Sequence, residues 1–294
     1  MLWGNIYKKM SPMKDTLISI CIPTYNGEKY LQEALNSVKT QTYRNFEVII
    51  SDDNSQDCTL DICNLFKKEV DFPVYIYNHT PTGIGANWNN CVEKANGDYI
   101  KFLFQDDILL SNCLQEMMEV FKQNEKIALV ASQRDFIYDR NYSNEKLQTW
   151  IHTFGDLQKT LNLSFVNNLC IIDKHIFKHE QFFWSPHNKI GEPTTVMFKK
   201  ELFKKIGNFN TELKQMLDYE YWYRVLKKYP IAIINKPLVK FRLHAAQTTV
   251  INEQNKVDEY DYHWWFAENK LMTKKEWFKR KIKFIFKRWL KTYQ

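Results

Sequence analysis

Two pairs of adjacent aspartates each follow an apolar run of the chain. Asp52-Asp53 follows the run at 46–50, and Asp106-Asp107 follows the run at 99–104. Both runs have the composition of short buried strands, which predicts each pair at the carboxyl end of a strand, where α/β sheets bind ligands. Adjacent carboxylates repel each other, so two such pairs favour a cationic or hydrogen-bonding ligand. A nucleotide with its metal ion satisfies both pairs.

The elements that must position these pairs alternate between strands and helices. Apolar runs predict strands, helical spacing predicts the segments between them, and Asp57 or Ser55 is the predicted N-cap of the second helix. This alternation is typical of a mostly parallel sheet with helices on both faces. We expect strands at 17–23, 46–50, 74–77 and 99–104, then at 127–132, 195–198 and 231–234, with helices at 200–206 and 219–228. Loops and short helices are expected between 141 and 190.

Composition excludes several classes of protein. The six cysteines form no C-x-x-C pair, which favours reduced cytoplasmic thiols over a disulfide framework or a zinc site. No signal peptide and no run of 18 or more apolar residues occurs, so we expect no membrane-spanning helix. The net charge is +7, but residues 273–294 alone carry nine Lys/Arg and one Glu. A basic character confined to the end of the chain argues against nucleic-acid binding by the core.

Motifs in a fixed order make the chain similar to the family-2 glycosyltransferases of the GT-A fold. The first three are Ile-Cys-Ile-Pro-Thr-Tyr-Asn at 20–26, Ser-Asp-Asp-Asn-Ser at 51–55 and Gln-Asp-Asp at 105–107. The resemblance spans about 17–249 and continues through 191–195, 207–209, 217–224 and 241–244. It implies a catalytic domain at 15–250, with a nucleotide-binding half at 15–120 and an acceptor-binding half at 121–250, and a basic helical tail at 251–294.

The resemblance implies a nucleotide pocket at the first two strand ends. Pro23, Tyr25 and Asn26 match the turn that forms one wall of this pocket, although the same residues also suit a simple strand-ending turn. Asp53 matches the position that hydrogen-bonds the base, and a carboxylate that accepts an imide N–H favours uracil or thymine. Asp52 either shares this role or caps the next helix.

The second aspartate pair matches the family's D-x-D region. There Asp106 is expected to contact the ribose or sugar, and Asp107 to ligate the Mg²⁺ or Mn²⁺ that bridges the diphosphate. Gln105 stands where the family often has an acid, which leaves fewer carboxylates for the metal. His244 matches a family histidine near the diphosphate and metal, and Arg242 offers a charge to the phosphates. An ordinary structural histidine is the alternative for His244.

Asp218 matches the catalytic base of the family's E-D motif, with Leu217 in place of the usual Glu. In an inverting displacement, one carboxylate deprotonates the acceptor hydroxyl as it attacks the anomeric carbon, without a covalent intermediate. Glu220 is the second choice for this base. Asp218 also suits the N-cap of the helix at 219–228, and both roles are compatible.

The tail has an apolar stripe surrounded by lysine and arginine. A basic amphipathic helix with tryptophans is typical of a monotopic anchor on an anionic cytoplasmic leaflet, whereas the alternative is a helix that packs its stripe on the catalytic domain. The stripe from Trp277 to Tyr293 consists of Phe278, Ile282, Ile285, Phe286, Trp289 and Leu290.

The favoured function is therefore an inverting, metal-dependent hexosyl- or N-acetylhexosaminyl-transferase. It would move one sugar from a nucleotide-diphosphosugar, a UDP-sugar above all, to a glycan or lipid-linked glycan, as in bacterial polysaccharide or lipopolysaccharide assembly at the inner face of the cell membrane. The processive Q-x-x-R-W segment is missing, which favours single additions. A sugar nucleotidyltransferase would need a Gly-rich loop where the chain has Pro23 to Asn26. A non-catalytic nucleotide-sugar-binding or membrane adaptor protein is the third hypothesis.

Overall fold

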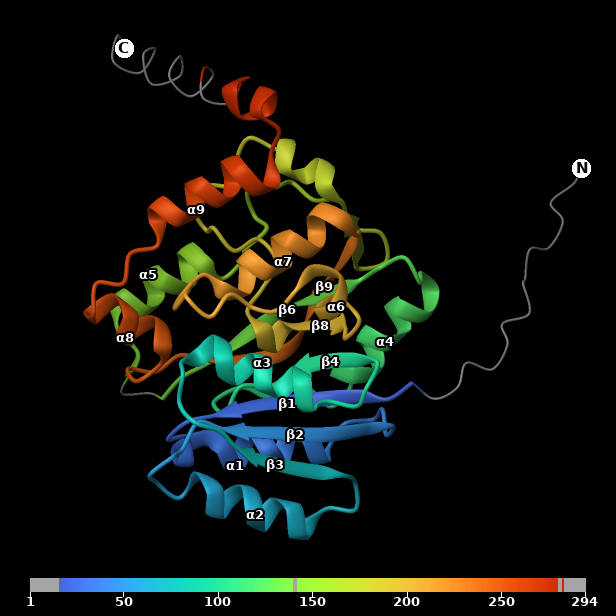
Figure 1. Ribbon diagram of the computed structural model, residues 1–294, viewed down its shortest axis with the longest axis vertical. Coiled ribbons are helices and arrows are strands. Elements are labelled where there is room, and N and C mark those ends of the chain that lie inside the picture. The colour runs from blue at the N-terminus through green and yellow to red at the C-terminus, as the bar shows by residue number, and fades with distance from the viewer. Residues whose placement is uncertain (1–15, 140–141, 280–281, 283–294) are drawn as a thin grey trace, which may run out of the picture.

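The computed structural model describes residues 16–139, 142–279 and 282. In this part of the chain the strands form one nine-stranded sheet in the order β3-β2-β1-β4-β8-β6-β9-β5, with β7 paired to β9. Helices cover both faces of the sheet (Figure 1). The predicted α/β architecture is confirmed.

The first half of the chain alternates strand and helix as predicted. Every residue of the first two strands is buried, as expected for strands covered on both faces. The first strand pairs in parallel with the second and fourth, and the second with the third, so their carboxyl ends meet at one edge. The elements are β1 (Ile18–Thr24), α1 (Glu28–Lys39), β2 (Phe46–Asp52), α2 (Thr59–Glu69), β3 (Val74–Asn78), α3 (Ile84–Lys94) and β4 (Tyr99–Phe102).

The two faces of this sheet have separate apolar cores. Ile20 and Val48 point toward the face where α1 packs with Leu31, whereas Cys21 and Ile49 belong to the cluster that contains the α3 residue Trp88. Such alternation along a strand is the two-residue period of side chains in a sheet. Helix α1 therefore lies on one face and α3 on the other.

Two details of this half differ from the prediction. Strand β4 ends at Phe102 and not at Phe104, because the backbone N–H of Phe104 turns to the Thr194 hydroxyl at 3.2 Å. The second helix has Cys58 at its N-cap, and neither Asp57 nor Ser55. Asp57 still serves the first turn, where its carboxylate accepts the Thr59 N–H at 3.0 Å.

In the second half, antiparallel pairings join the parallel ones. Strand β8 is antiparallel to both β4 and β6, whereas β6 and β9 run parallel. The elements are β5 (Ile108–Leu109), α4 (Cys113–Gln123), β6 (Leu129–Ile137), α5 (Glu145–Phe154), β7 (Leu169–Ile172), η2 (Lys174–Lys178), η3 (Pro193–Thr195), β8 (Val196–Lys199), α6 (Leu202–Ile206), α7 (Leu217–Lys228) and β9 (Ile231–Arg242).

Strand β9 is much longer than the predicted strand at 231–234. The residues Asn235-Lys236-Pro237 look like a turn, and proline cannot donate to a ladder. Here Pro237 lies opposite Gln133, between two register shifts of the β6–β9 pairing. The irregularity accommodates the proline, so the strand continues to Arg242 at the aspartate-pair edge.

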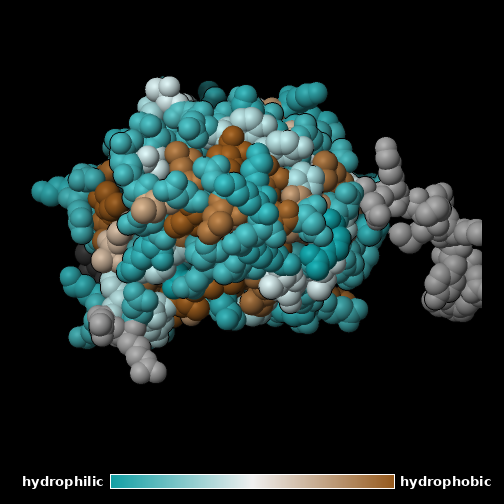
Figure 2. Space-filling model, turned by 90° about the horizontal axis from the view of Figure 1, so that it is seen from below, coloured by the Kyte–Doolittle hydropathy of each residue, from teal (hydrophilic) through white to brown (hydrophobic). Residues whose placement is uncertain are grey.

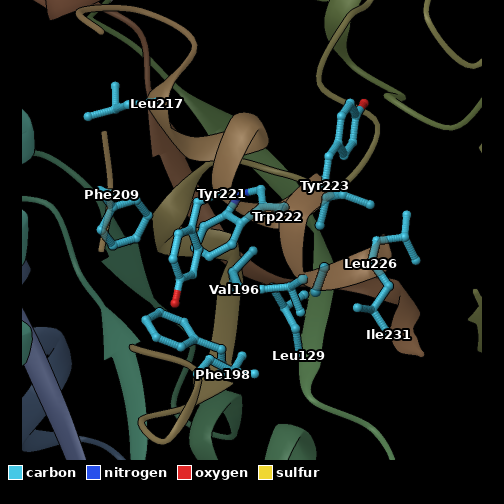
Figure 3. Packing of buried hydrophobic residues seen from close by; sticks show 14 of the residues in the cluster. Leu129, Val196, Phe198, Phe209, Leu217, Tyr221, Trp222, Tyr223, Leu226 and Ile231 are labelled. Atoms are coloured by element: carbon cyan, nitrogen blue, oxygen red, sulfur yellow. The ribbon is translucent and has the colours of Figure 1, made fainter. Parts of the chain in front are cut away.

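Helix α7 is anchored by three consecutive aromatic residues, Tyr221, Trp222 and Tyr223, none of which is exposed. Figure 3 shows Tyr221 and Trp222 packed with Phe198 of β8 and Phe209, whereas Tyr223 points to the other side of the helix. Trp222 also donates its indole N–H to the Gly191 carbonyl at 3.0 Å. This packing holds the middle of the helix on the sheet.

The chain after β9 folds back onto α7. It forms α8 (Thr248–Gln254), α9 (Tyr260–Phe266) and the π-helix η4 (Ala267–Leu271), and Phe266, Ala267 and Leu271 belong to the main apolar cluster. In Figure 1, α9 lies next to α7 at the end of the molecule opposite α2. Within the residues described, no helix combines the length and apolarity needed to cross a membrane.

Candidate active site

The turn after β1 is held by a side chain from the motif at 105–107. The Gln105 amide accepts the Tyr25 N–H at 2.9 Å and donates to the Tyr25 carbonyl at 3.1 Å. A Cβ at Gly27 would lie 2.3 Å from the Gln105 Oε1, so a larger residue there would push the Gln105 side chain out of this position. A carboxylate could not donate the second hydrogen bond, which explains glutamine at a position where an acid is common.

The predicted wall residues differ in exposure. Pro23 is buried in β1, whereas the Tyr25 side chain is 56% exposed and thus free to stack on a planar ligand. Asn26 has a φ of 45°, a left-handed conformation that asparagine tolerates. Its side-chain oxygen accepts the Gln56 N–H at 2.8 Å, which ties the first turn to the second.

The first aspartate pair divides into a structural and an available carboxylate. Asp52 is fully buried, and its oxygens accept hydrogen bonds from Thr24 Oγ1, Ser55 N and Ser55 Oγ at 2.7–2.8 Å. It therefore fixes the two turns to each other. Asp53 contacts His79 Nδ1 through one oxygen at 2.8 Å, and burial raises its pKa while His79 opposes the rise. No sequence motif includes His79.

In the second aspartate pair, the side chain of Asp106 contacts His244. Their Oδ2 and Nε2 atoms lie 2.9 Å apart, and both side chains are partly exposed. Asp107 is almost completely buried, and its two oxygens accept the Arg242 N–H at 2.9 Å and the Thr194 hydroxyl at 2.6 Å. Burial, and then the charge of Asp106, raise the pKa of Asp107. The structure thus pairs His244 with Asp106, not with the Asp107 expected beside it.

Arg242 has its guanidinium occupied within the protein. It donates to Glu33 at 2.6 Å and to the Asp106 carbonyl at 2.8 Å, and it lies over the Tyr30 ring. The side chain is only 7% exposed. Arg242 therefore supports the Asp106 backbone, and its expected contact with phosphate is not visible in this arrangement.

Asp218 lies in the first turn of α7, where Met216 and not Asp218 is the N-cap. Its Oδ1 accepts the Tyr219 N–H at 2.7 Å and its Oδ2 accepts the Asn188 amide at 2.9 Å. Burial raises the Asp218 pKa to about 8, and the charge of Glu192 adds to the rise. A carboxylate with this pKa is well suited to accept a proton near neutral pH.

Glu220, the second choice for a base, is engaged elsewhere. It is buried, and both of its oxygens bind the Arg224 guanidinium at 2.9–3.1 Å. A carboxylate neutralised by a bidentate arginine is a poor proton acceptor. The geometry therefore favours Asp218.

The segment 188–194 joins the two acidic centres. Asn188 at its start binds Asp218 at 2.9 Å, and Thr194 at its end binds Asp107 at 2.6 Å. Between them Glu192 pairs with Arg134 at 3.0 Å, although Glu192 Oε2 and Arg134 Nε are buried without a hydrogen-bond partner. Sequence motifs marked Glu192 and Thr194 but assigned neither a role, and Asn188 has no sequence signal at all.

A separate cavity of about 760 Å³ lies along the open edge of β3. Seen from the α2 end, the surface mixes hydrophobic and hydrophilic side chains (Figure 2). None of the predicted site residues lines this cavity, and His79 connects it to Asp53. Its lining consists of Leu60, Asn64, Lys67, Ile76, Tyr77, Asn78, His79, Asn90 and Lys94.

Metal binding at the second pair depends on a small donor set. In the described part of the chain, no three His, Cys, Asp or Glu side chains form a group able to hold an ion. Asp106 and His244 supply two adjacent donor atoms. This suits Mg²⁺ or Mn²⁺ only when water and phosphate oxygens complete the shell, which is how such ions bind at diphosphate sites.

Parallel strands within a mixed sheet that end in polar turns beside acidic side chains are typical of α/β enzymes that bind a nucleotide. The chain matches the family model described as glycosyl transferase family 2 over residues 19–207. It belongs to glycosyl transferase family 2.

Similar proteins agree with this assignment. An uncharacterized glycosyltransferase of Rickettsia typhi is 29% identical over 84% of this chain and 70% of its own length. A Campylobacter jejuni GalNAc(5)-diNAcBac-PP-undecaprenol beta-1,3-glucosyltransferase is 36% identical over 38% of this chain and 36% of its own.

Solved structures show the same fold. TarS of S. aureus, residues 1–349 in complex with UDP, superposes with a TM-score of 0.59 at 20% identity, over 78% of this chain and 61% of that one. The mannosyltransferase PcManGT from Pyrobaculum calidifontis, in complex with GDP-Man and Mn²⁺, gives 0.54 at 16% identity, over 79% and 57%. The chain thus spans less than two thirds of either structure.

Proposed function

We propose that this glycosyltransferase moves one sugar, with inversion, from a nucleotide-diphosphosugar to a hydroxyl of a glycan or lipid-linked glycan. The observation that carries the proposal is the segment 188–194, which holds the buried carboxylate of Asp218 at one end and the Asp106-Asp107 turn at the other. A proton acceptor and a diphosphate site are the two parts that an inverting transfer needs, and no covalent intermediate is required.

The donor side of the site favours a uridine or thymidine diphosphate. The exposed Tyr25 ring offers a stacking face, and the second oxygen of Asp53, which His79 does not occupy, can accept an imide N–H. Asp106 and His244 would hold a divalent cation together with the diphosphate. Asp107 accepts the Arg242 N–H and so holds the end of β9 that precedes His244. The cation would supply charge stabilisation for the leaving diphosphate.

On the acceptor side, Asp218 takes the proton of the attacking hydroxyl. Asn188 and the Tyr219 N–H hold its two oxygens, so the carboxylate keeps one orientation. Its raised pKa makes it a stronger base than an exposed aspartate. Glu192 lies in the same segment and pairs with the buried Arg134 of β6, and its partly exposed side chain would orient the acceptor.

A lipid-linked acceptor suits a peripheral position at the inner face of the cell membrane, with the basic tail on an anionic surface. Trp277 packs against Trp264 at 5.9 Å, whereas Phe278 and Ile282 are 64% and 52% exposed. The rest of the predicted stripe, at 285–290, lies outside the described residues. The undecaprenol named in the Campylobacter relative supports this proposal. Sedimentation with anionic and neutral vesicles tests it, and equal binding to both would contradict it.

The decisive test is a calorimetric panel of UDP, dTDP, GDP and CMP with and without Mn²⁺. We expect Mn²⁺-dependent binding of UDP or dTDP, and its loss in Asp106→Asn and His244→Ala. The exposed His152, mutated to Ala, is the matched control and should bind like the wild type. If no nucleotide binds under any condition, the adaptor hypothesis replaces the enzymatic one, provided that the wild-type protein is folded.

A further inference from the structure

The segment that follows β9 reaches the residues immediately before α7. The Glu259 carboxylate accepts three successive backbone N–H groups, from Lys214 at 2.7 Å, Gln215 at 3.3 Å and Met216 at 2.9 Å. Asn252, which is buried, donates to the Lys214 carbonyl at 3.1 Å. The turn that leads into the helix bearing Asp218 is therefore held from outside the 19–207 family match.

The same segment also contacts the loop on the other side of Asp218. His263 Nε2 and His187 Nδ1 each lie 3.1 Å from the Phe183 carbonyl, and the centroids of the two tilted rings lie 4.3 Å apart. Burial lowers the pKa of both histidines, that of His263 to about 4, so both are neutral at physiological pH. The residue after His187 is Asn188, whose amide binds Asp218.

A carboxylate bound by three backbone amides is a strong restraint. Charge-assisted hydrogen bonds are about twice as strong as neutral ones. Glu259 binds backbone N–H groups of a short turn before α7, where no regular structure would otherwise fix the conformation. Loss of this carboxylate frees the turn, and the start of α7 moves with it.

From these contacts we propose that Glu259 is a positioning residue for Asp218. Glu259 binds the backbone N–H groups of residues 214–216 and so fixes the first turn of α7. His263, in the same segment 252–263, contacts the loop that leads to Asn188, so the segment supports Asp218 from two sides. The inference rests on the proposed role of Asp218 as the base, and it makes the chain beyond β9 part of the acceptor site.

The test compares Glu259→Ala and Glu259→Gln with Glu268→Ala. Glu268 is an exposed carboxylate in the same segment with no polar contact among the described residues, which makes it the matched control. Selective ¹³C labelling of aspartate side chains allows the titration of Asp218 to be followed by NMR in the ligand-free protein, and the Asp218→Asn spectrum identifies its signal.

We expect Glu259→Ala to lower the Asp218 pKa, because burial is the main cause of its rise and a freed turn lets solvent reach the carboxylate. Asn188 and Glu192, which face Asp218 from the segment 188–194, and Tyr219 on α7 itself are unchanged in the variant. Glu259→Gln keeps one acceptor oxygen, so the Asp218 pKa in this variant should lie between those in the wild type and in Glu259→Ala. An Asp218 titration identical in Glu259→Ala and wild type overturns the proposal.

Kinetics add a second readout, with UDP-GlcNAc and UDP-glucose hydrolysis as the probe. Glu259→Ala should lower kcat about tenfold or more at unchanged donor KM, and Glu259→Gln should restore most of it. A rise in donor KM with unchanged kcat contradicts positioning of the base. If the wild type turns over neither sugar nucleotide, the proposed function is in question, whereas the NMR titration still decides the inference about Glu259. If Glu259→Ala does not fold, the same two readouts on Glu259→Gln decide.

Discussion

The two halves of the active site are built in different ways. In the nucleotide half, Tyr25, Asn26 and Asp53 sit on turns that directly follow parallel strands, and nearby side chains bind the backbone of those turns. In the acceptor half, Asp218 lies in the first turn of a buried helix and depends on Asn188 and, through the turn at 214–216, on Glu259. The nucleotide half is thus built on turns at the ends of neighbouring strands, whereas the acceptor half is built on a helix start that loops from both sides hold in place.

The largest expected effect is a loss of sugar transfer without a loss of nucleotide binding. Asp218→Asn removes the proton acceptor but leaves the turns after β1 and β2 intact, so transfer should fall about 10²–10⁴-fold. Nucleotide binding, measured by calorimetry, should stay within a factor of two. A variant that loses nucleotide affinity as well would show that the halves are not independent.

In the second aspartate pair, we expect Asp107 to matter for the stability of the fold and Asp106 for nucleotide binding. Asp107→Ala leaves the buried Arg242 N–H and Thr194 hydroxyl without an acceptor, which should lower the free energy of unfolding by about 1–3 kcal/mol. Asp106→Ala should change stability much less and abolish Mn²⁺-dependent nucleotide binding. Urea denaturation with calorimetry measures both, and the reverse pattern would restore Asp107 as the metal ligand.

The pH dependence of transfer should follow Asp218. Its carboxylate must be ionised to accept a proton, and its pKa is raised to about 8, so the rate should climb with pH and level off above 8. Glu192→Gln removes a negative charge that raises this pKa and should shift the profile to lower pH. Asn188→Ala removes a hydrogen bond that favours the charged form and should shift it to higher pH. Profiles that coincide for all three proteins would exclude Asp218 as the titrating group.

The smallest effect concerns the clamp on Tyr25. Gln105→Glu introduces the acid common in the family but removes the donor to the Tyr25 carbonyl, which costs about 1 kcal/mol or roughly fivefold in UDP affinity. Gln148→Glu, on the exposed face of α5, is the matched control for the added charge. Tighter UDP binding by Gln105→Glu would argue that the position serves the metal.

The success of the sequence predictions follows this same division. Strand ends and turn residues in the first half are encoded locally, so the α/β fold was predictable and the turns around Tyr25 and Asp53 lie close to their predicted places. The predicted strand ends were wrong where a residue distant in sequence sets them. Thr194 shortens β4, and the register shift beside Pro237 extends β9. The roles assigned to the eight predicted residues remain predictions. His79, Asn188 and Glu259 have no local pattern, because their function depends only on tertiary contacts.

The position of Cys58 offers an optical route to the nucleotide half. It is exposed at the N-cap of α2, whereas the other five cysteines are buried or partly buried. Its backbone N–H donates to Glu28 at 2.9 Å, which places it beside the turn that carries Asn26. A maleimide dye should therefore react first at this thiol, and its fluorescence would report in real time when a sugar nucleotide arrives and leaves.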